Sequence, residues 1–168
     1  MQIHNTAFIA PGAIVRGNVI LGEDTSVWYH AVIRGDRDFI AVGRGSNIQD
    51  NCVVHVEEGN PVVIGENVTV GHSAVLHGCR IGNNTLIGMG AIIMDGCVIG
   101  ENCIVGAGAL VTQNTVIPEH SLVVGSPARV KRQVTAEETE ASLKNARLYV
   151  EEAAKAREES SGHGNDAK

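Results

Sequence analysis

Three histidines are the residues of this chain whose types and spacing best suit chemistry. His72 and His77 lie five residues apart in the segment GHSAVLHG, and His55 lies seventeen residues before His72 in the segment DNCVVHVEEG. Both segments are rich in small apolar residues, whereas histidine has only an intermediate preference for the protein interior. Imidazole is also the commonest metal ligand among side chains. The question is whether one fold can bring the three rings to one metal ion.

Composition and charge narrow the classes of protein to which the chain can belong. Its 168 residues suit one domain, and its formal net charge of −6 comes without a long cluster of Lys and Arg. The negative net charge and the absence of a long basic cluster disfavour a nucleic-acid-binding protein. The chain also lacks a basic leader segment and an apolar run of the roughly 18 residues that would span a membrane. We therefore expect a soluble, cytoplasmic protein without nucleic-acid or membrane partners.

An aliphatic residue recurs at every sixth position over most of the chain, and this repeat is the main evidence for the fold. From the middle of the chain onward the series runs Ile81, Ile87, Ile93, Ile99, Val105, Val111, Ile117 and Val123. A period of six matches neither the alternation of an ordinary strand nor the turn of a helix. It is typical of a parallel β-helix, in which three hexads complete one coil of a triangular prism. We therefore predict an all-β domain of this kind over residues 1–134.

The hexad repeat ends near residue 134, and a helical pattern follows it. Thr135 and Glu138 have the spacing of a capping box, after which apolar residues recur at helical intervals. We predict a C-terminal helix in residues 135–159, beginning near 136 and packed along the prism. The polar segment 160–168, which contains His163, is expected to be a disordered tail.

The four cysteines fit the repeat. Cys52, Cys97 and Cys103 each lie four residues after an aliphatic repeat position, where small residues occur in other hexads. We expect them to be reduced, buried thiols inside a narrow core. Cys79 lies two residues after His77, so a role as a metal ligand stays open for it, although no CxxC motif supports that role.

The register of the repeat predicts where the three histidines lie. Val54 and Ile64 are ten residues apart rather than six, which indicates a four-residue insertion that forms an external loop. Of the 22 residues between His55 and His77, 18 remain after the insertion is subtracted, which is one full coil. These two rings should therefore stack about 5 Å apart on one face. His72 belongs to an adjacent face, so it completes the site only from a neighbouring chain, as a cyclic trimer allows.

Three histidines without a fourth protein ligand are typical of a catalytic zinc site rather than a structural one. The open position holds a water whose pKa falls toward neutrality, which supplies a hydroxide nucleophile. Zinc is the expected metal, and Fe²⁺ or Co²⁺ would also accept imidazole ligands. The alternative is that the histidines only form hydrogen bonds at turns.

Polar residues cluster in the same part of the repeat. Gln49 follows Ile48 as His55 follows Val54, so its amide should face the metal region and hydrogen-bond water or substrate there. Arg34 and Asp36 in the segment VIRGDRDF could pair across a subunit interface, or form a solvated ion pair of little energetic value.

Several of these segments resemble the gamma-class carbonic anhydrases and their short bacterial relatives. The segments are VIRGD, SNIQDNCVVH, VTVGHSAVLHGCRIG, IGMGAIIMDG and VVGSPARVKR, and the resemblance covers about residues 5–155. It implies a left-handed parallel β-helix that assembles as a homotrimer, with zinc or iron at each interface. It also implies that His55, His72 and His77 are the metal ligands.

The resemblance implies further roles for other side chains. Gln49 would orient the hydroxide, Arg34 and Asp36 would pair at the interface, and Asp50 would be an acid just behind the ligands. Glu58 has the offset from the first ligand of a proton-shuttle glutamate, although its loop is short. Arg37 stands where the family's best-studied enzymes have a glutamate. Tyr149 resembles a tyrosine near the metal pocket of short relatives, and its alternative role is to pack the helix on the prism.

The function predicted from these features is the reversible hydration of CO₂ to bicarbonate by a metal-bound hydroxide at a trimer interface. A hydrolase of acyl thioesters could use the same hydroxide on a larger carbonyl, and would need a wider cleft near residues 57–61. A metal-free hexapeptide acyltransferase that uses one histidine as a base is a third class. A non-catalytic assembly subunit on the same fold is also compatible with the sequence.

Overall fold

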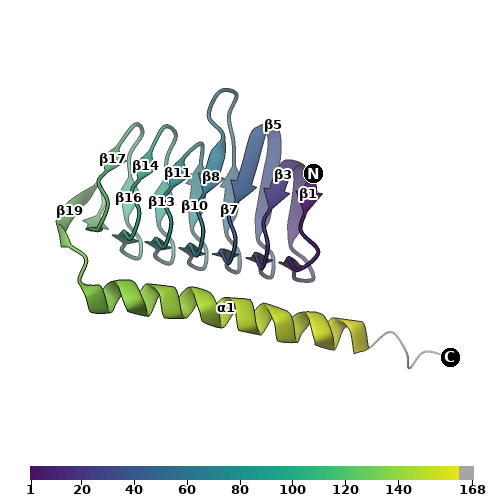
Figure 1. Cartoon of the computed structure of the whole chain (residues 1–168). Coiled ribbons are helices and arrows are strands. Elements are labelled where there is room, and N and C mark those ends of the chain that lie inside the picture. The colour runs from purple at the N-terminus through teal and green to yellow at the C-terminus, as the bar shows by residue number, and fades with distance from the viewer. Residues whose placement is uncertain (163–168) are drawn as a thin grey trace.

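The structure is a computed structural model that describes residues 1–162. Short parallel strands stack coil upon coil into a β-solenoid, and a single long helix lies along it (Figure 1). In-register parallel pairs such as Leu76 with Ile93 and Ile87 with Val105 join successive coils. The hexapeptide β-helix predicted from the sequence is confirmed.

The prism has three faces. The 11-stranded sheet forms two of them, because it bends around a corner within β5 (Val32–Val42). The first half of β5 pairs with the first face and its second half pairs with the second face. The first face continues through β7 (Val53–His55), β10 (Val75–His77), β13 (Ile92–Ile93) and β16 (Leu110–Val111). The second face continues through β8 (Val62–Ile64), β11 (Arg80–Ile81), β14 (Val98–Ile99) and β17 (Val116–Ile117). At the other end, β3 (Ile14–Leu21) pairs with β5, and β1 (Gln2–Ile3) pairs with β3.

The third face is a separate sheet of eight strands. It runs through β2 (Phe8–Ile9), β4 (Ser26–Val27), β6 (Asn47–Ile48), β9 (Thr69–Val70), β12 (Leu86–Ile87), β15 (Ile104–Val105), β18 (Ser121–Gly125) and β19 (Ala128–Gln133). The last strand turns back and pairs antiparallel with β18. The repeat therefore ends in a hairpin, which covers the last hydrogen-bonding edge of this face.

The hexad residues form the core of the prism. Ile48, Val54, Val70, Leu76 and Ile87 are all fully buried, as the repeat requires. Each such side chain contributes about 1.5–3 kcal/mol relative to an exposed one. All four cysteines are free and lie in the same core, as predicted for Cys52, Cys97 and Cys103.

Corners between faces require backbone conformations that few residues adopt. Asn67, Asn84 and Asn102 all have positive φ at one corner, and their side-chain amides hydrogen-bond from coil to coil at 3.2 Å. Asparagine tolerates this region better than most residues. Beside them, a Cβ on Gly82 would lie 2.6 Å from the main chain of Glu101, so only glycine allows the coils to stack here. The repeat thus depends on the turn residues as much as on the core.

The helix α1 (Ala136–Gly162) runs back along the prism toward the first coils (Figure 1). Its capping box forms as predicted: the Thr135 amide donates to Glu138 Oε2 at 2.9 Å, and the Glu138 amide donates to Thr135 Oγ1 at 3.2 Å. The helix continues three residues beyond the predicted end at residue 159. The remainder of the predicted tail, residues 163–168 with His163, lies outside the described residues.

Aromatic side chains attach the helix to the third face. Tyr149 contacts Trp28 edge to face with ring centroids 5.4 Å apart, and Trp28 contacts Phe8 in the same way at 5.3 Å. Nearer the end of the helix, Arg157 donates a hydrogen bond to the main-chain oxygen of Thr6. No helix within residues 1–162 is long and apolar enough to cross a membrane.

Candidate metal centre

His55 and His77 stack at one corner of the prism, between the first and second faces. The two residues pair directly in the register of β7 and β10, as the sequence arithmetic predicted. Their ring centroids lie 5.0 Å apart, and His55 Nδ1 lies 3.0 Å from His77 Nε2. Both rings are partly buried, with 16% and 32% of the side-chain surface exposed. Two imidazoles therefore present nitrogens to one point that solvent can reach.

A carboxylate flanks each end of this stacked pair. Asp36 Oδ1 lies 2.9 Å from His55 Nε2, and Asp95 Oδ1 lies 2.5 Å from His77 Nδ1. The column of Asp36, His55, His77 and Asp95 is named the His55 corner below. The hydrogen bond from His55, helped by Arg34, lowers the pKa of Asp36 below its ordinary value. Asp36 therefore stays ionised at neutral pH and can orient the ring beside it.

His72 lies at a different corner, between the third and first faces, in the turn after β9. Its Nδ1 lies 2.8 Å from Asp50 Oδ2, one coil before it in the same column. We name this pair the His72 corner. Because Nδ1 faces the carboxylate, Nε2 is the nitrogen left for another partner. The ring is 44% exposed, so it is available at the surface of the chain.

The three histidines do not converge within one chain. Among residues 1–162, no three His, Cys, Asp or Glu side chains gather closely enough to hold a metal ion. His72 lies in the turn after β9 of the third face, apart from the stacked pair as the register arithmetic predicted, and the first face lies between them. The shared site between chains stays a prediction at this point.

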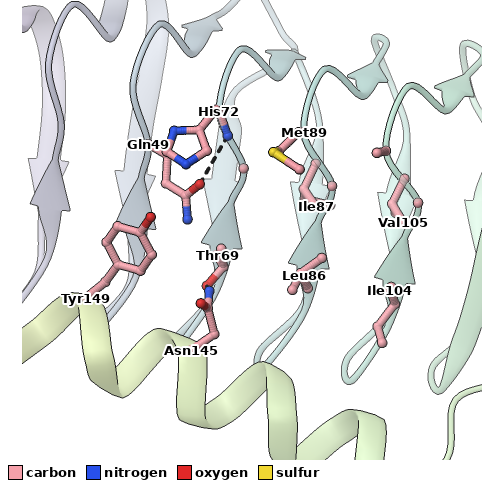
Figure 2. Close-up of a pocket in the computed structure, with 14 residues that line it drawn as sticks. Gln49, Thr69, His72, Leu86, Ile87, Met89, Ile104, Val105, Asn145 and Tyr149 are labelled. Carbon is pink, nitrogen blue, oxygen red and sulfur yellow. Dashed lines mark hydrogen bonds between the residues drawn. The ribbon is translucent and has the colours of Figure 1, made fainter.

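A groove beside His72 runs between the third face and the helix, with a volume of about 430 Å³ (Figure 2). Leu86, Ile104 and Met89 make its walls largely apolar. Gln49 and His72 lie together at one end of it, and the Tyr149 hydroxyl points toward them from the helix. The groove therefore leads from an apolar surface to the polar groups of the His72 corner.

Hydrogen bonds fix the amide of Gln49, which is 4% exposed. Its Oε1 accepts from the His72 main-chain amide at 3.1 Å, and its Nε2 donates to Asn47 Oδ1 at 3.2 Å. Asn47 in turn donates to Thr69 Oγ1 at 3.0 Å, and Asn145 of the helix donates to the same oxygen at 3.2 Å. Since the carbonyl of Gln49 is used inside the chain, one remaining N–H is the group it offers to the groove.

Tyr149 lies where the helix meets both the prism and the groove, and its role near a metal stays a prediction. Its ring packs on Trp28, and it lines the groove with Gln49 and His72. Burial, followed by the nearby carboxylate of Asp50, raises the pKa of Tyr149 above its ordinary value. The phenol is therefore neutral at physiological pH and carries a proton that it can donate.

The charged residues near the loop after β7 form ion pairs within the chain, and the Arg34–Asp36 pair has the solvated form that the sequence left open. Arg34 pairs with Asp36 in the same strand, and Arg37 pairs with Glu57 at 2.5 Å. The Arg37 guanidinium lowers the pKa of Glu57 below its ordinary value. Glu58 is exposed, and its main-chain amide donates to Glu57 Oε1 at 3.3 Å. Glu57 is thus the carboxylate that the loop holds in place.

Cys79 points into the core and not toward the His55 corner. It is 1% exposed, and burial raises the pKa of its thiol. Burial likewise raises the pKa of Cys52 to about 11. Both thiols therefore stay protonated at neutral pH, whereas a metal ligand must be a thiolate. The geometry gives no support to Cys79 as a ligand.

Sequence reasoning assigned no role to Asp95, Asn47, Thr69 or Asn145. Asp95 had a clear signal, since it follows His77 by 18 residues, one full coil along the same column. Asn47 precedes Gln49 by two residues and so lies beside it on the strand. Asn145 had no such signal, because its contact depends on how the helix lies against the prism.

Curated proteins of similar sequence indicate the family to which this chain belongs. A protein named "Probable carbonic anhydrase" from Methanocaldococcus jannaschii is 57% identical and covers 89% of this chain and 94% of its own length. "Gamma carbonic anhydrase 1, mitochondrial" of Arabidopsis thaliana is 48% identical, covering 81% of this chain and 52% of its own length. The chain belongs to the gamma carbonic anhydrase family.

Other proteins and families that match this chain carry the names of transferases. The family "Bacterial transferase hexapeptide (six repeats)" matches residues 1–35 and 78–113, and "Hexapeptide repeat of succinyl-transferase" matches residues 61–93. A crystal structure of a putative acetyltransferase from Bacillus cereus superposes with a TM-score of 0.92 at 41% identity, covering 94% of this chain and 91% of that one. The solenoid is therefore common to both activities, and the site must distinguish them.

Proposed function

We propose that this protein catalyses the reversible hydration of CO₂ to bicarbonate at a divalent metal. In this proposal His55 and His77 of one chain and His72 of the next bind the metal, in a homotrimer with three such sites. The observation that carries the proposal is the 3.0 Å approach of His55 Nδ1 and His77 Nε2 in paired register. Identity of 48–57% to proteins named as carbonic anhydrases supports the choice of substrate.

The donor set fits a zinc-like ion. Two nitrogens bound to one tetrahedral zinc at 2.0–2.1 Å would lie roughly 3.3 Å apart, close to the observed distance between the two rings. Each of the three imidazoles also has a carboxylate beside one nitrogen: Asp36, Asp50 and Asp95. Metal-binding histidines commonly have such a partner, which fixes the ring and its tautomer. A divalent cation there would lower the pKa of a water toward neutrality and so supply the nucleophile.

The chain's own residues would bind and orient the substrate. The apolar walls of the groove suit uncharged CO₂, and the remaining N–H of Gln49 can donate to an oxygen of CO₂ or bicarbonate. The Tyr149 phenol at the same end is a second donor. Because Asn47 holds Gln49 Nε2 and the His72 amide holds its carbonyl, this side chain is oriented before substrate arrives.

Acyl transfer or acyl hydrolysis is a second candidate, favoured by one observation. The groove volume of about 430 Å³ lies in the range of small-molecule pockets and far exceeds what CO₂ needs. The pocket next to residues 59–61, where a thioesterase cleft was expected, is smaller, at about 90 Å³. Assays of CO₂ hydration and of acetyl-CoA hydrolysis on the same metal-loaded sample would decide between the two activities.

A complementation experiment tests the shared site. His72→Ala trimers and His77→Ala trimers should each be metal-poor and inactive. When the two variants are unfolded, mixed equally and refolded, about one interface in four joins an intact stacked pair to an intact His72. About a quarter of wild-type activity should therefore return. No recovery in well-formed mixed trimers would contradict the shared site but leave the family assignment untouched.

The identity of the metal requires a separate measurement. Zinc is our first choice, and Fe²⁺ or Co²⁺ would suit the same ligands. Metal analysis of protein purified without oxygen should give about one ion per chain. A cytoplasmic location stays a prediction from the sequence.

A further inference from the structure

Asp95 makes the shorter of the two carboxylate contacts to the stacked rings. Its Oδ1 lies 2.5 Å from His77 Nδ1, and its side chain is 30% exposed. It lies in the turn after β13, one coil beyond His77 in the same column. The main-chain oxygen of Asp95 already accepts the coil-to-coil hydrogen bond from Asn114 at 2.9 Å. The carboxylate is thus not needed for the backbone pattern and is directed at the imidazole.

This contact determines which nitrogen of His77 carries a proton. A carboxylate at 2.5 Å accepts a hydrogen bond, so Nδ1 is the protonated nitrogen. In the neutral ring Nε2 then has the free lone pair, and it faces His55 Nδ1. The nitrogen that can bind a metal is therefore the one that points to the neighbouring ring.

The backbone between the two residues is shaped to admit the carboxylate. Gly78 has a φ of +52°, and a Cβ there would lie 2.4 Å from Asp95 Oδ1. Any larger residue at this position would displace the carboxylate from His77. A close approach of this kind is a general reason for glycine at a fixed position. Gly78 and Asp95 thus act together on the same ring.

We infer that Asp95 is a positioning residue that holds His77 in the metal-binding tautomer, with Gly78 providing the space for its carboxylate. This inference rests on the proposed metal site. His72 has an equivalent partner, because its Nδ1 lies 2.8 Å from Asp50. In both histidines the carboxylate therefore contacts the same ring atom. Partners of this type typically change metal affinity by 10- to 100-fold.

Zinc affinity of the full-length protein, measured by competition with a chromophoric chelator, tests the inference. Asp95→Ala should bind zinc about 10- to 100-fold more weakly than wild type. Asp95→Asn keeps an oxygen acceptor of the same shape and should recover part of this loss. Gly78→Ala should reproduce the loss, because it displaces the carboxylate.

Glu101→Ala is the matched control. Glu101 also contacts a residue 18 positions before it, since Asn83 Nδ2 donates to its Oε1 at 2.9 Å, but no histidine takes part. This variant should bind zinc as wild type does. The unfolding temperatures of metal-free Asp95→Ala and Glu101→Ala should be similar, which separates positioning from general stability.

Nitrogen NMR of the metal-free protein provides a readout independent of metal. The His77 ring should show the Nδ1–H tautomer in wild type and a mixture of tautomers in Asp95→Ala. An unchanged tautomer together with zinc affinity within threefold of wild type would overturn the inference. If wild type itself binds no zinc, the proposed function fails, while the tautomer measurement still judges the role of Asp95.

Discussion

The His55 corner and the His72 corner are built from the same repeat but differ in what lies one coil further along. At the His55 corner, His77 is followed by Asp95, so a polar column extends from Asp36 across the stacked rings. At the His72 corner, the main-chain oxygen of His72 accepts from Gly90, and the neighbouring Met89 is 59% exposed. One corner therefore offers two imidazoles and two carboxylates, and the other offers one imidazole and one carboxylate beside an apolar surface.

This difference shows how a repeat can carry two unlike halves of a site. A solenoid places equivalent residues in columns, so a ligand pair arises when histidine occurs twice in one column. A third ligand on another column cannot reach that pair, because the corner residues of a prism point outward in different directions. Under the proposed function the two corners are complementary halves that meet between chains.

The largest effect should follow from breaking the stacked pair. His55→Ala or His77→Ala removes one of two ligands from the same column, and we expect loss of bound metal and of CO₂ hydration. Metal content by elemental analysis and hydration by stopped-flow would measure both. His4→Ala is the control, since His4 is exposed and contacts Thr6 rather than the site. Full metal occupancy in both variants would show that His55 and His77 are not metal ligands.

A smaller effect is expected at the other corner when only the carboxylate is removed. Asp50→Ala leaves all three imidazoles in place but releases Nδ1 of His72. Zinc affinity should fall by about 10-fold or more, as for other carboxylates that orient a histidine ligand. The same chelator competition would measure it. Equal zinc affinity in Asp50→Ala and wild type would mean that His72, unlike His77, does not need a carboxylate to orient its ring.

Tyr149→Phe should have a modest effect, confined to activity. The ring contact with Trp28 is kept, so stability should change by less than about 1 kcal/mol, whereas a lost hydrogen bond of about 1 kcal/mol lowers the rate roughly fivefold. Tyr149→Ala, which also removes the ring, should lower the unfolding temperature as well. If Tyr149→Phe keeps full activity, the residue serves only to pack the helix.

The smallest expected effect is on how stability depends on pH, and it arises at the start of the helix, away from both corners. The Arg132 guanidinium and the Thr135 amide lower the pKa of Glu138 to about 2, from an ordinary value of 4.5. Its contribution to stability is therefore complete above about pH 4.5 and is lost as the pH falls toward 2. Glu138→Gln should unfold at a lower temperature than wild type at pH 7, and this difference should disappear near pH 2. A difference that persists in acid would contradict the charge-based account.

Much of the site could be predicted because the repeat converts sequence spacing into position. His55 and His77 were placed one coil apart by subtracting one insertion, and the same arithmetic applied to Asp50 and Asp95 gives their partners. The groove could not be predicted in this way, because its wall is formed by the helix. Contacts such as Asn145 with Thr69 depend on the angle and distance of that helix, for which the hexad period carries no information.

The helix also has a consequence for the order in which the protein is made. Phe8 and Trp28 belong to the first coils, and Tyr149, which packs on Trp28, is synthesised about 140 residues after Phe8. At 5–20 residues per second the ribosome needs roughly 7–28 s for that interval. During translation the aromatic surface of the first coils is therefore exposed to chaperones and to other nascent chains until the last segment covers it.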